Sequence, residues 1–242
     1  MKLDAVILGA GEFPKKPYPR LLLEQADMIV CCDGAAASFY RYFGDRRKPD
    51  AVVGDMDSLP HRLRELYADR LVPVSEQETN DQTKALTWLL DRYPPIPAPC
   101  HPEAAPCHPE ARQGREDLLL SSITLLGATG KREDHTIGNL SLLMEYARTR
   151  GIDGLSFPSI RIVSDYTESF AIRDSATLYV GEGRGISVFS PDNTLKIKSS
   201  GLQWPLDEVV WDNWWKATLN RASADAVTLE FSHPSVALVM LR

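Results

Sequence analysis

Three features that would assign a protein to a class at once are scarce or absent in this sequence: cysteine, long hydrophobic runs and clusters of basic residues. The four cysteines fall as an adjacent pair, Cys31 and Cys32, in an apolar run, and as Cys100 and Cys107 in a proline-rich stretch. This is not the pattern of a small secreted disulfide framework. The longest apolar run near the N-terminus, residues 5–10, is too short for a signal peptide or a transmembrane helix. We therefore expect a cytoplasmic protein without a membrane partner.

Positive charge is also in deficit, since 27 Lys and Arg stand against 33 Asp and Glu and give a net charge of −6. A protein that binds along a nucleic acid needs a basic face, which this composition does not favour. The hydrophobic and charged fractions, 43% and 25%, are those of an ordinary globular protein and exclude disorder as a description of the whole chain. The expected partner is a small molecule rather than a nucleic acid.

The first two thirds of the chain alternate short apolar runs with helical patterns, which predicts a mostly parallel sheet with crossover helices. The predicted strands are residues 5–8, 28–32, 51–53, 71–74, 123–126 and 161–163. Their near-continuous apolar character is typical of strands that are covered on both faces. The clearest helix is residues 135–150, with Asp134 as the expected N-cap and Gly151 as the stop signal. Its apolar face is predicted from Ile137, Leu140, Met144 and Ala147.

The last third predicts a second domain of a different class. From about Ser169, short alternating segments are separated by turn residues, and no helix-length period remains. The predicted strands are residues 170–172, 177–180, 186–189, 195–198, 226–231 and 236–241. The expected fold is therefore an α/β N-terminal domain with a mostly parallel sheet, residues 1–165, followed by an all-β sandwich C-terminal domain, residues 166–242.

Residues 94–117 interrupt the first domain with a proline-rich stretch in which Pro-Cys-His-Pro-Glu-Ala occurs twice. This composition predicts an insertion loop rather than a core element. The two Cys-His pairs could serve as four zinc ligands, but a short tandem duplication explains the same spacing without a metal. We favour the duplication, because a structural zinc site also needs a fixed backbone around its ligands.

The expected carboxyl ends of the parallel strands, where ligands of such sheets bind, are rich in aspartate. Asp33 follows the second predicted strand, Asp55 and Asp57 follow the third, and Asp81 follows the fourth. Four carboxylates that crowd one edge repel one another unless a cation or hydrogen-bond donors offset their charge. This edge is the first candidate for a functional site.

Asp55 and Asp57 support two interpretations of about equal weight when they are taken alone. Separated by one residue on a turn, the two carboxylates could share a Mg²⁺ ion, which prefers oxygen ligands. Equally, Asp57 and Ser58 could cap a helix that begins near Pro60.

Glycine-containing segments follow two other predicted strands. Gly9-Ala10-Gly11 follows the first strand, but Pro14 takes the place of the third glycine of a dinucleotide fingerprint. The glycines of this segment either admit a ligand to the backbone or only make the turn. Residues 127–135 combine glycines, two cationic side chains and a helix N-terminus, which predicts an anion site. The alternative is that Arg132 pairs with a neighbouring carboxylate and that His135 is a surface residue.

Together, these residues resemble the thiamine pyrophosphokinase family. The resemblance is carried by five short motifs that keep the family's order: Cys32-Asp33-Gly34-Ala35, Gly54-Asp55-Met56-Asp57-Ser58, the run from Gln77 through Asn80-Asp81 to Lys84-Ala85-Leu86, Gly127-Ala128-Thr129-Gly130-Lys131-Arg132-Glu133-Asp134-His135, and Gly201-Leu202-Gln203-Trp204-Pro205-Leu206. The sequence departs from the family pattern at Ala35, at Asn80 and at Leu219-Asn220, where the family usually has glycine, threonine and a Ser-Asn pair.

The resemblance implies an α/β nucleotide-binding domain, a C-terminal β-sandwich and a homodimer with active sites between the subunits. The implied reaction is the Mg²⁺-dependent transfer of pyrophosphate from ATP to the hydroxyl group of thiamine, which yields thiamine diphosphate and AMP. Two alternatives keep the same acidic edge: another Mg²⁺-dependent phosphoryl or nucleotidyl transferase, and a module that binds ATP without turnover.

The resemblance also assigns roles to individual residues. The carboxylates that would hold Mg²⁺ are those of Asp33, Asp55, Asp57 and Asp81. Arg132 would stabilise the charge of the transferred phosphates, and Asp134 or His135 would accept the hydroxyl proton. The other residues assigned to the binding of ATP or thiamine are Gly9, Gly34, Gln77, Asn80, Lys84, Gly130, Lys131, Trp204 and Asn220.

Trp204 is the candidate for an aromatic wall against thiamine, whose thiazolium ring is cationic. The competing interpretation is that four tryptophans form a packed core or an interface in the second domain. These tryptophans are Trp204, Trp211, Trp214 and Trp215.

Overall fold

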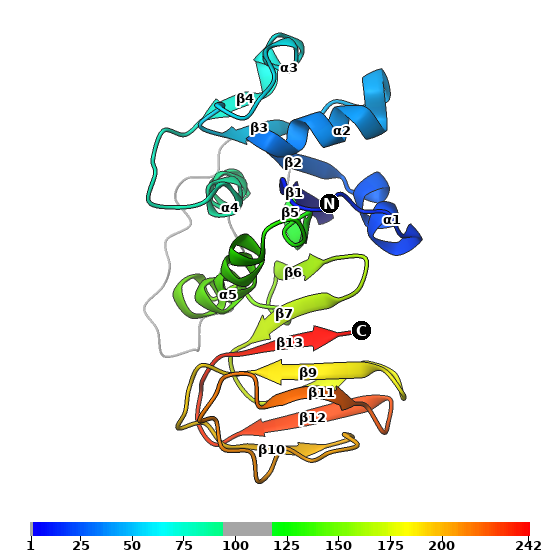
Figure 1. The fold of residues 1–242 in the computed structure, drawn as a ribbon, viewed down its shortest axis with the longest axis vertical. Coiled ribbons are helices and arrows are strands. Elements are labelled where there is room, and N and C mark those ends of the chain that lie inside the picture. The colour runs from blue at the N-terminus through cyan, green and yellow to red at the C-terminus, as the bar shows by residue number, and fades with distance from the viewer. Residues whose placement is uncertain (1, 94–117) are drawn as a thin grey trace.

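A ten-stranded sheet runs the length of the molecule in the computed structural model, which describes residues 2–93 and 118–242 (Figure 1). In order across the sheet, the strands are β4 (Leu71–Pro73), β3 (Ala51–Gly54), β2 (Met28–Cys32), β1 (Lys2–Leu8), β5 (Leu119–Leu126), β6 (Ser159–Val163), β7 (Glu168–Ile172), β13 (Ala237–Leu241), β9 (Gly185–Phe189) and β11 (Ala217–Arg221). A second sheet has three strands, β10 (Ile197–Ser200), β12 (Ala226–Phe231) and β8 (Ala176–Tyr179).

The N-terminal half of the large sheet is parallel, from β4 through β3, β2, β1 and β5 to β6. Its central strands are buried on both faces, as their apolar sequences predict: all five residues of β2 are buried. The helices are α1 (Pro17–Gln25), α2 (Ala36–Phe43), α3 (His61–Leu66), α4 (Asp81–Arg92) and α5 (Glu133–Arg150). Short 3₁₀ turns cover Asp33–Ala35, Gly44–Arg46 and Ala68–Arg70. None of the helices in the described ranges is long and apolar enough to span a membrane.

The strand order creates a switch point between β1 and β5. The chain moves outward from β1 through β2 and β3 to β4, and then returns to place β5 on the other side of β1. At such a point the connections leave in opposite directions, so a crevice opens at the carboxyl ends of the two strands. The fold therefore positions a ligand site beside the loops that follow β1 and β5.

The C-terminal half confirms the expected change to antiparallel β structure, but it is joined to the first half in a way that was not expected. Strand β7 pairs antiparallel with β6, and β13, β9 and β11 extend the same sheet. A second hydrophobic core lies between the three-stranded sheet and these strands, and it includes Val188, Val227 and Leu229. One sheet thus serves both the α/β layer and the sandwich.

Strand β11 was missed by the sequence analysis. Its pairing with β9 is irregular between Ala217 and Asn220, where Leu219 has a φ of +60°. A bulged edge strand lacks the strict alternation of buried and exposed side chains on which strand prediction depends.

The prediction for the long helix needs two corrections. Helix α5 begins at Glu133, with Arg132 at the N-cap, so Asp134 lies inside the first turn rather than at the cap. The buried face is formed by Leu143, Tyr146 and Ala147, whereas Ile137 is 59% exposed. The first turns of α5 border a pocket, which leaves Ile137 exposed, whereas Leu140 and Met144 are partly buried against the main core and Ala147 is buried, as predicted.

The predictions for the proline-rich insertion and its Cys-His pairs concern residues 94–117, which lie outside the described residues. The other two cysteines, Cys31 and Cys32, are buried free thiols in β2. Burial raises the pKa of the Cys31 thiol well above its usual value, which makes this side chain an unreactive part of the core.

Asp153 ties the loop after α5 to the end of β7. Its Oδ1 accepts hydrogen bonds from the backbone N–H groups of Leu155 and Ser156, each at 2.8 Å. Its Oδ2 lies 2.6 Å from Nε of Arg173, which follows β7. The residue is only 5% exposed, so its removal would leave donors without partners near the junction of the two halves.

We expect Asp153→Ala to lower the free energy of unfolding by about 2–3 kcal/mol, most of it from the unpaired N–H groups, because Arg173 is half-exposed and its ion pair is screened. Urea denaturation measures this change. The exposed Asp91 on α4 provides the control, and Asp91→Ala should stay within about 0.5 kcal/mol of the native protein. Equal effects of the two substitutions would contradict the role of Asp153.

Candidate functional site

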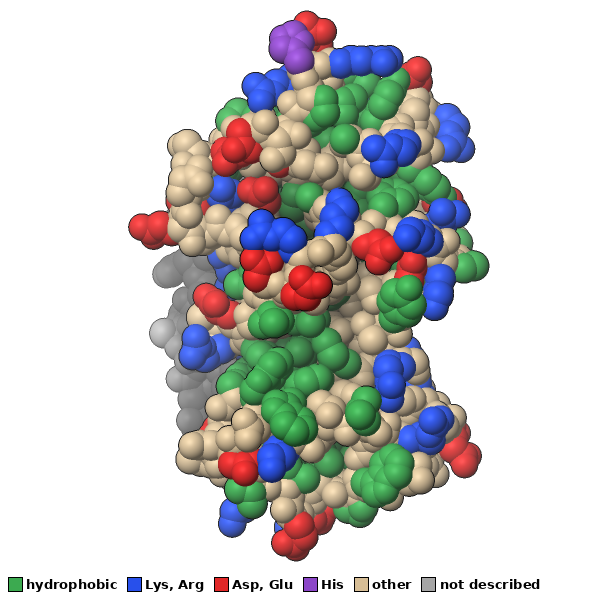
Figure 2. Space-filling model, in the orientation of Figure 1, with side chains coloured by type: hydrophobic (Ala, Val, Ile, Leu, Met, Phe, Trp, Pro, Cys, Tyr) green, Lys and Arg blue, Asp and Glu red, His purple; other side chains and the backbone are tan. Residues whose placement is uncertain are grey.

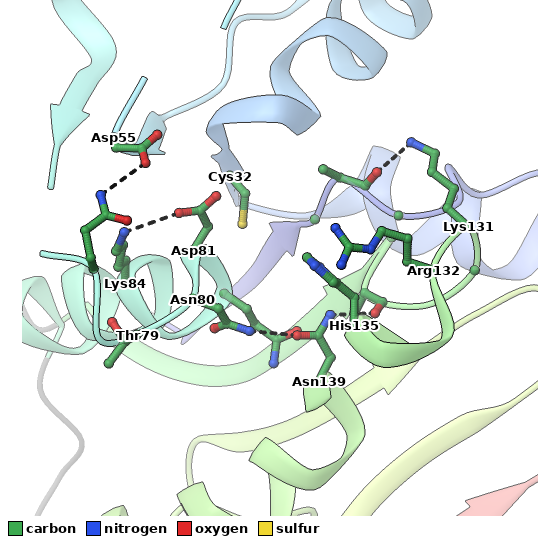
Figure 3. Close-up of a pocket in the computed structure, with 18 residues that line it drawn as sticks. Cys32, Asp55, Thr79, Asn80, Asp81, Lys84, Lys131, Arg132, His135 and Asn139 are labelled. Carbon is green, nitrogen blue, oxygen red and sulfur yellow. Dashed lines mark hydrogen bonds and ion pairs between the residues drawn. The ribbon is translucent and has the colours of Figure 1, made fainter. Parts of the chain in front are cut away.

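A pocket of about 420 Å³ opens at the carboxyl ends of the parallel strands. Its walls come from the end of β2, from the segments that follow β1, β3, β4 and β5, and from the N-terminal ends of α4 and α5 (Figure 3). This is the crevice that the switch point between β1 and β5 predicts. Its volume lies in the range of pockets for small molecules and cofactors.

Asp55, which lines one wall of this crevice, belongs to a cluster of three carboxylates. Oxygen atoms of Asp33, Asp55 and Asp57 lie within 4.8 Å of one another. Asp33 is buried, whereas the other two are exposed. The three residues come from the ends of β2 and β3, so the parallel pairing of these strands brings them together. The expectation that strand-end aspartates converge is met by these three.

The carboxylates of the cluster are oriented by nearby donors. The backbone N–H of Ser58 donates to Oδ2 of Asp33 at 3.3 Å, and the backbone N–H of Asp57 donates to Oδ1 of Asp55 at 3.2 Å. The Gln77 side chain donates to the other oxygen of Asp55 at 3.4 Å. The bonds from Asp57 and Gln77 lower the pKa of Asp55 and keep it ionised.

The alternative role of Asp57 and Ser58 as a helix cap does not describe the structure. Helix α3 begins at His61 with Pro60 at the N-cap, and no side chain caps it. The Ser58 hydroxyl instead donates to Oδ1 of Asp57 at 3.1 Å.

Asp81, the fourth aspartate, is held slightly apart from the cluster. It occupies the first turn of α4, and its Oδ1 lies 3.6 Å from Nζ of Lys84, a side chain that is only 4% exposed. Gly54 leaves room for Asp33 and Asp81 to approach, because a Cβ there would lie 3.0 Å from Cβ of Asp33 and 3.4 Å from Oδ1 of Asp81. Burial and the charge of Asp81 raise the pKa of Asp33, and burial raises the pKa of Asp81 despite Lys84.

Burial is the main reason for the raised pKa values of Asp33 and Asp81, and the charges of neighbouring aspartates add to it. A cation bound between the carboxylates would remove the repulsion between them. The donor set consists only of oxygen atoms, which suits a hard divalent cation and not a thiolate-binding metal.

The opposite wall is cationic and stands at the N-terminus of α5. Nζ of Lys131 donates to the carbonyl oxygen of Ala10 at 2.6 Å, which links this wall to the loop after β1. Arg132 and His135 project into the same pocket (Figure 3). Cationic side chains and free backbone N–H groups at a helix N-terminus form an environment for an anion.

Arg132 also forms an ion pair with a neighbouring carboxylate, which was the alternative to a role in anion binding. Its Nε and Nη2 donate to the two oxygens of Asp134 at 3.1 and 2.5 Å. This contact and the backbone N–H of His135 lower the pKa of Asp134 to about 2. Both groups are exposed, so the pair can exchange with solvent or with another anion.

The glycines of the two loops are needed for the loops to pack against each other. A Cβ at Gly9 would lie 2.7 Å from the carbonyl oxygen of Gly127, and a Cβ at Gly11 would lie 2.5 Å from it. Gly130 has a φ of +77°, and a Cβ there would lie 2.6 Å from Cβ of Glu12. The close packing of the two loops is therefore enough to explain why position 9 is a glycine, although Gly9 also lines the pocket.

Asn80 connects α4 to the cationic wall. Its Oδ1 accepts from the backbone N–H of Thr83 at 3.0 Å and caps α4, and its Nδ2 donates to Oδ1 of Asn139 at 2.8 Å. Asn139 in turn donates to the carbonyl oxygen of Ala128 at 2.7 Å. Sequence reasoning missed Asn139, although its position four residues after His135 places both on one face of α5.

Most of the predicted site residues line the pocket: Gly9, Asp55, Gln77, Asn80, Asp81, Lys84, Gly130, Lys131, Arg132 and His135. Six others are not among its lining residues: Asp33, Gly34, Asp57, Asp134, Trp204 and Asn220. Cys32 and Thr79 line it without having been predicted. Cys32 could have been found, because it directly precedes Asp33 at a strand end.

Trp204 and Asn220 form a separate unit in the C-terminal half. Trp204 is 54% exposed, and Asn220 is buried. The Asn220 side chain holds the backbone of Trp204 from both sides, because its Oδ1 accepts from the N–H at 3.2 Å and its Nδ2 donates to the carbonyl oxygen at 2.6 Å. The four tryptophans do not form a common core: Trp211 is buried, and Trp214 and Trp215 are exposed.

Comparisons with known proteins agree on one family. The model described as "Thiamin pyrophosphokinase, catalytic domain" matches residues 19–152, and "Thiamin pyrophosphokinase, substrate-binding domain" matches residues 170–235. Thiamine pyrophosphokinase 1 of Oryza sativa subsp. japonica is 28% identical over 219 residues, which cover 84% of this chain and 74% of that protein. Thiamine pyrophosphokinase 1 of Arabidopsis thaliana is 28% identical over 207 residues, 78% of this chain and 68% of that protein.

Solved structures show the same fold. The thiamine pyrophosphokinase of Bacillus subtilis superposes with a TM-score of 0.69 at 17% identity and covers 98% of both chains. The yeast thiamin pyrophosphokinase superposes with a TM-score of 0.71 at 16% identity, over 99% of this chain and 86% of that one.

The raised pKa of Asp33 leads to a prediction about stability. At pH 7 without a divalent cation, its ionised form destabilises the folded protein, and this cost disappears as the pH falls through the raised folded pKa. Asp33→Asn should therefore raise the midpoint of thermal unfolding at pH 7, because the amide carries no charge into the buried site. The gain should shrink as the pH approaches about 4, the usual range of an aspartate.

The matched control is Asp174→Asn on the exposed turn after β7, which should leave the midpoint unchanged at both pH values. A lower midpoint for Asp33→Asn at pH 7 would mean that the hydrogen bond from Ser58 outweighs the cost of burying the charge of Asp33 near Asp81, against the electrostatic account.

Proposed function

The chain belongs to the thiamine pyrophosphokinase family, and we propose that it binds ATP and Mg²⁺ in the pocket between β1 and β5. It is an enzyme that transfers a pyrophosphate group to thiamine, as its relatives are named for doing. One observation carries the proposal: the pocket is lined on one side by Asp55, a member of the carboxylate cluster, and on the other side by a cationic helix N-terminus. This pairing matches the needs of a metal-bound polyphosphate.

The residues that would hold Mg²⁺ are Asp55 and Asp57, with Asp33 completing the cluster. The ion would neutralise charge on the polyphosphate and leave open positions for its oxygens. Asp81 lies on the neighbouring helix α4. Its contact with Lys84 keeps the ammonium group of that lysine at the edge of the site. Gln77 orients Asp55 and Asn80 orients the start of α4.

The cationic wall would bind the phosphates of ATP. Arg132 exchanges its exposed partner Asp134 for phosphate oxygens, which present the same bidentate geometry to a guanidinium group. Lys131, Gly130 and the N-terminus of α5 add donors and positive potential on the same side. Gly9 and Gly34 let the loops after β1 and β2 stand close to the ligand.

The reaction is an in-line attack of the thiamine hydroxyl oxygen on the β-phosphorus of ATP, with AMP as the leaving group. His135 is the residue we assign as the proton acceptor, because it lines the pocket. Asp134 is the weaker candidate, since its pKa of about 2 makes it a poor base while Arg132 remains bound.

Thiamine would bind where a second subunit meets this pocket. Trp204 supplies the aromatic wall, and Asn220 fixes its backbone. The same stretch of the chain, residues 204–219, carries four other exposed hydrophobic side chains: Val210, Trp214, Trp215 and Leu219. Figure 2 shows hydrophobic side chains gathered over the region where α5, β13 and β9 lie in Figure 1. Such a surface favours association, so we propose a homodimer with active sites between the subunits.

Residues 1–165 form the catalytic unit and residues 166–242 form the unit that binds thiamine and the partner subunit. The protein acts in the cytoplasm, where its free thiols Cys31 and Cys32 stay reduced.

The purified protein with Mg²⁺, ATP and thiamine should form thiamine diphosphate and AMP in equal amounts. The reason is that attack at the β-phosphorus releases the α-phosphate with the nucleoside. Separation of nucleotides by anion-exchange chromatography checks the products, and a reaction without thiamine is the control. ADP as the sole nucleotide product would instead indicate an ordinary kinase.

Mixing two inactive variants tests the position of Trp204. Asp55→Asn and Trp204→Ala should each lower turnover strongly, but their heterodimer contains one site without either lesion. A random mixture should therefore regain about a quarter of the native activity, since half of the dimers are mixed and each has one intact site of two.

The matched control is a mixture of Asp55→Asn and Asp57→Asn, whose lesions lie in the carboxylate cluster of one subunit and should not complement each other. Absence of recovery with Trp204→Ala, when subunit exchange is shown by mass spectrometry, would place both residues in the site of one subunit or make Trp204 structural.

A further inference from the structure

The residue between the two exposed aspartates of the cluster has an unusual backbone conformation. Met56 has a φ of +70°. Among the described residues, only Lys131 and Leu219 share a positive φ without being glycine, and of the three only Met56 is buried. A non-glycine residue keeps this left-handed conformation only where the surrounding structure fixes it.

The conformation of Met56 determines where the carboxylates lie. The Met56 side chain packs in the main hydrophobic core, while Asp55 and Asp57 on either side of it are exposed. The left-handed residue thus lets the chain reverse within one position, so that both carboxylates approach Asp33. With an extended residue at position 56, Asp55 and Asp57 would share a face but lie about 6.6 Å apart along the chain. The turn instead lets the backbone N–H of Asp57 donate to Oδ1 of Asp55 at 3.2 Å.

Arg64 on α3 is the side chain that holds this turn. Its Nη2 donates to the carbonyl oxygen of Met56, and its Nε donates to the carbonyl oxygen of Leu59 at 3.1 Å. One rigid guanidinium group therefore fixes two carbonyls of the segment that carries Asp57. The segment is further attached to Asp33 by the backbone N–H of Ser58.

We infer that Arg64 is a positioning residue for the divalent cation, acting through the left-handed conformation of Met56 rather than by contact with the carboxylates. The inference rests on the proposed function, because it concerns the same cluster. Outer residues that orient metal ligands typically change metal affinity by about 10- to 100-fold when they are removed. Within the described residues, the Arg64 side chain makes hydrogen bonds to backbone carbonyls alone, so its effect on the carboxylates passes through the turn.

The experiment measures Mn²⁺ binding by electron paramagnetic resonance, without ATP or thiamine, so that it does not depend on activity. We expect Arg64→Ala to weaken Mn²⁺ binding about tenfold. Arg62→Ala is the matched control: it removes the same charge from the same helix, but Arg62 contacts the Tyr40 hydroxyl at 3.3 Å. Its affinity should stay within about twofold of the native value.

Arg64→Ala combined with Met56→Gly tests whether Arg64 acts on metal binding through the turn at Met56. Glycine adopts a positive φ without strain, so in Met56→Gly the turn needs Arg64 less. Arg64→Ala should then weaken binding by less than about threefold relative to Met56→Gly alone, although loss of the buried Met56 side chain lowers stability in both. A merely structural loss would be the same in both backgrounds.

Three results would overturn the inference: native affinity in Arg64→Ala, equal loss in Arg62→Ala, or an unchanged tenfold loss in the Met56→Gly background. If Arg64→Ala does not fold, as judged by circular dichroism, Arg64→Lys replaces it. That variant keeps the charge but reaches one carbonyl instead of two, so it should still weaken binding, and native affinity would contradict the proposal.

Asp55→Asn separates this inference from the proposed function. If Asp55→Asn abolishes Mn²⁺ binding while Arg64→Ala binds normally, the metal site stands and only the role of Arg64 fails. If Asp55→Asn binds like the native protein, both proposals fail.

Discussion

The repulsion between carboxylates at one edge of the sheet is the constraint on which the rest of the site depends. Asp33, Asp55 and Asp57 lie within 4.8 Å of one another, and Asp81 adds its charge from α4. The structure opposes this repulsion with local donors: backbone N–H groups on Asp33 and Asp55, and the buried ammonium group of Lys84 beside Asp81. These contacts orient the carboxylates without neutralising them, which leaves the edge ready for a cation.

The two walls of the pocket are connected through the backbone more than through ion pairs. The loops after β1 and β5 pack so closely that glycine is needed at Gly9, Gly11 and Gly127. Lys131 donates across these loops to Ala10, and the Asn80–Asn139 contact joins α4 to α5. A rigid frame of this kind suits phosphoryl chemistry, in which the protein acts mainly by positioning and by stabilising charge.

The sequence predicted the parallel sheet well, because buried parallel strands leave a clear local pattern. Strand β2 was predicted with its observed bounds, and the motifs that follow the strands identified ten of the residues that line the pocket. Strand β11 was missed because its bulge at Leu219 breaks the alternation. Asn139 was missed because an asparagine on a helix becomes informative only when its partners Asn80 and Ala128 are known.

By itself, the sequence determined the class of each half, the acidic edge and the helix N-terminus at Glu133 to within two residues, since these follow from periodicity and from residue type. Tertiary structure alone decided that one sheet continues from β6 through β7 into the sandwich, and that Asp81 stands apart with Lys84. It also decided the left-handed turn at Met56 and its contact with Arg64. Each of these depends on segments that meet only after folding, and local pattern carries no information about such contacts.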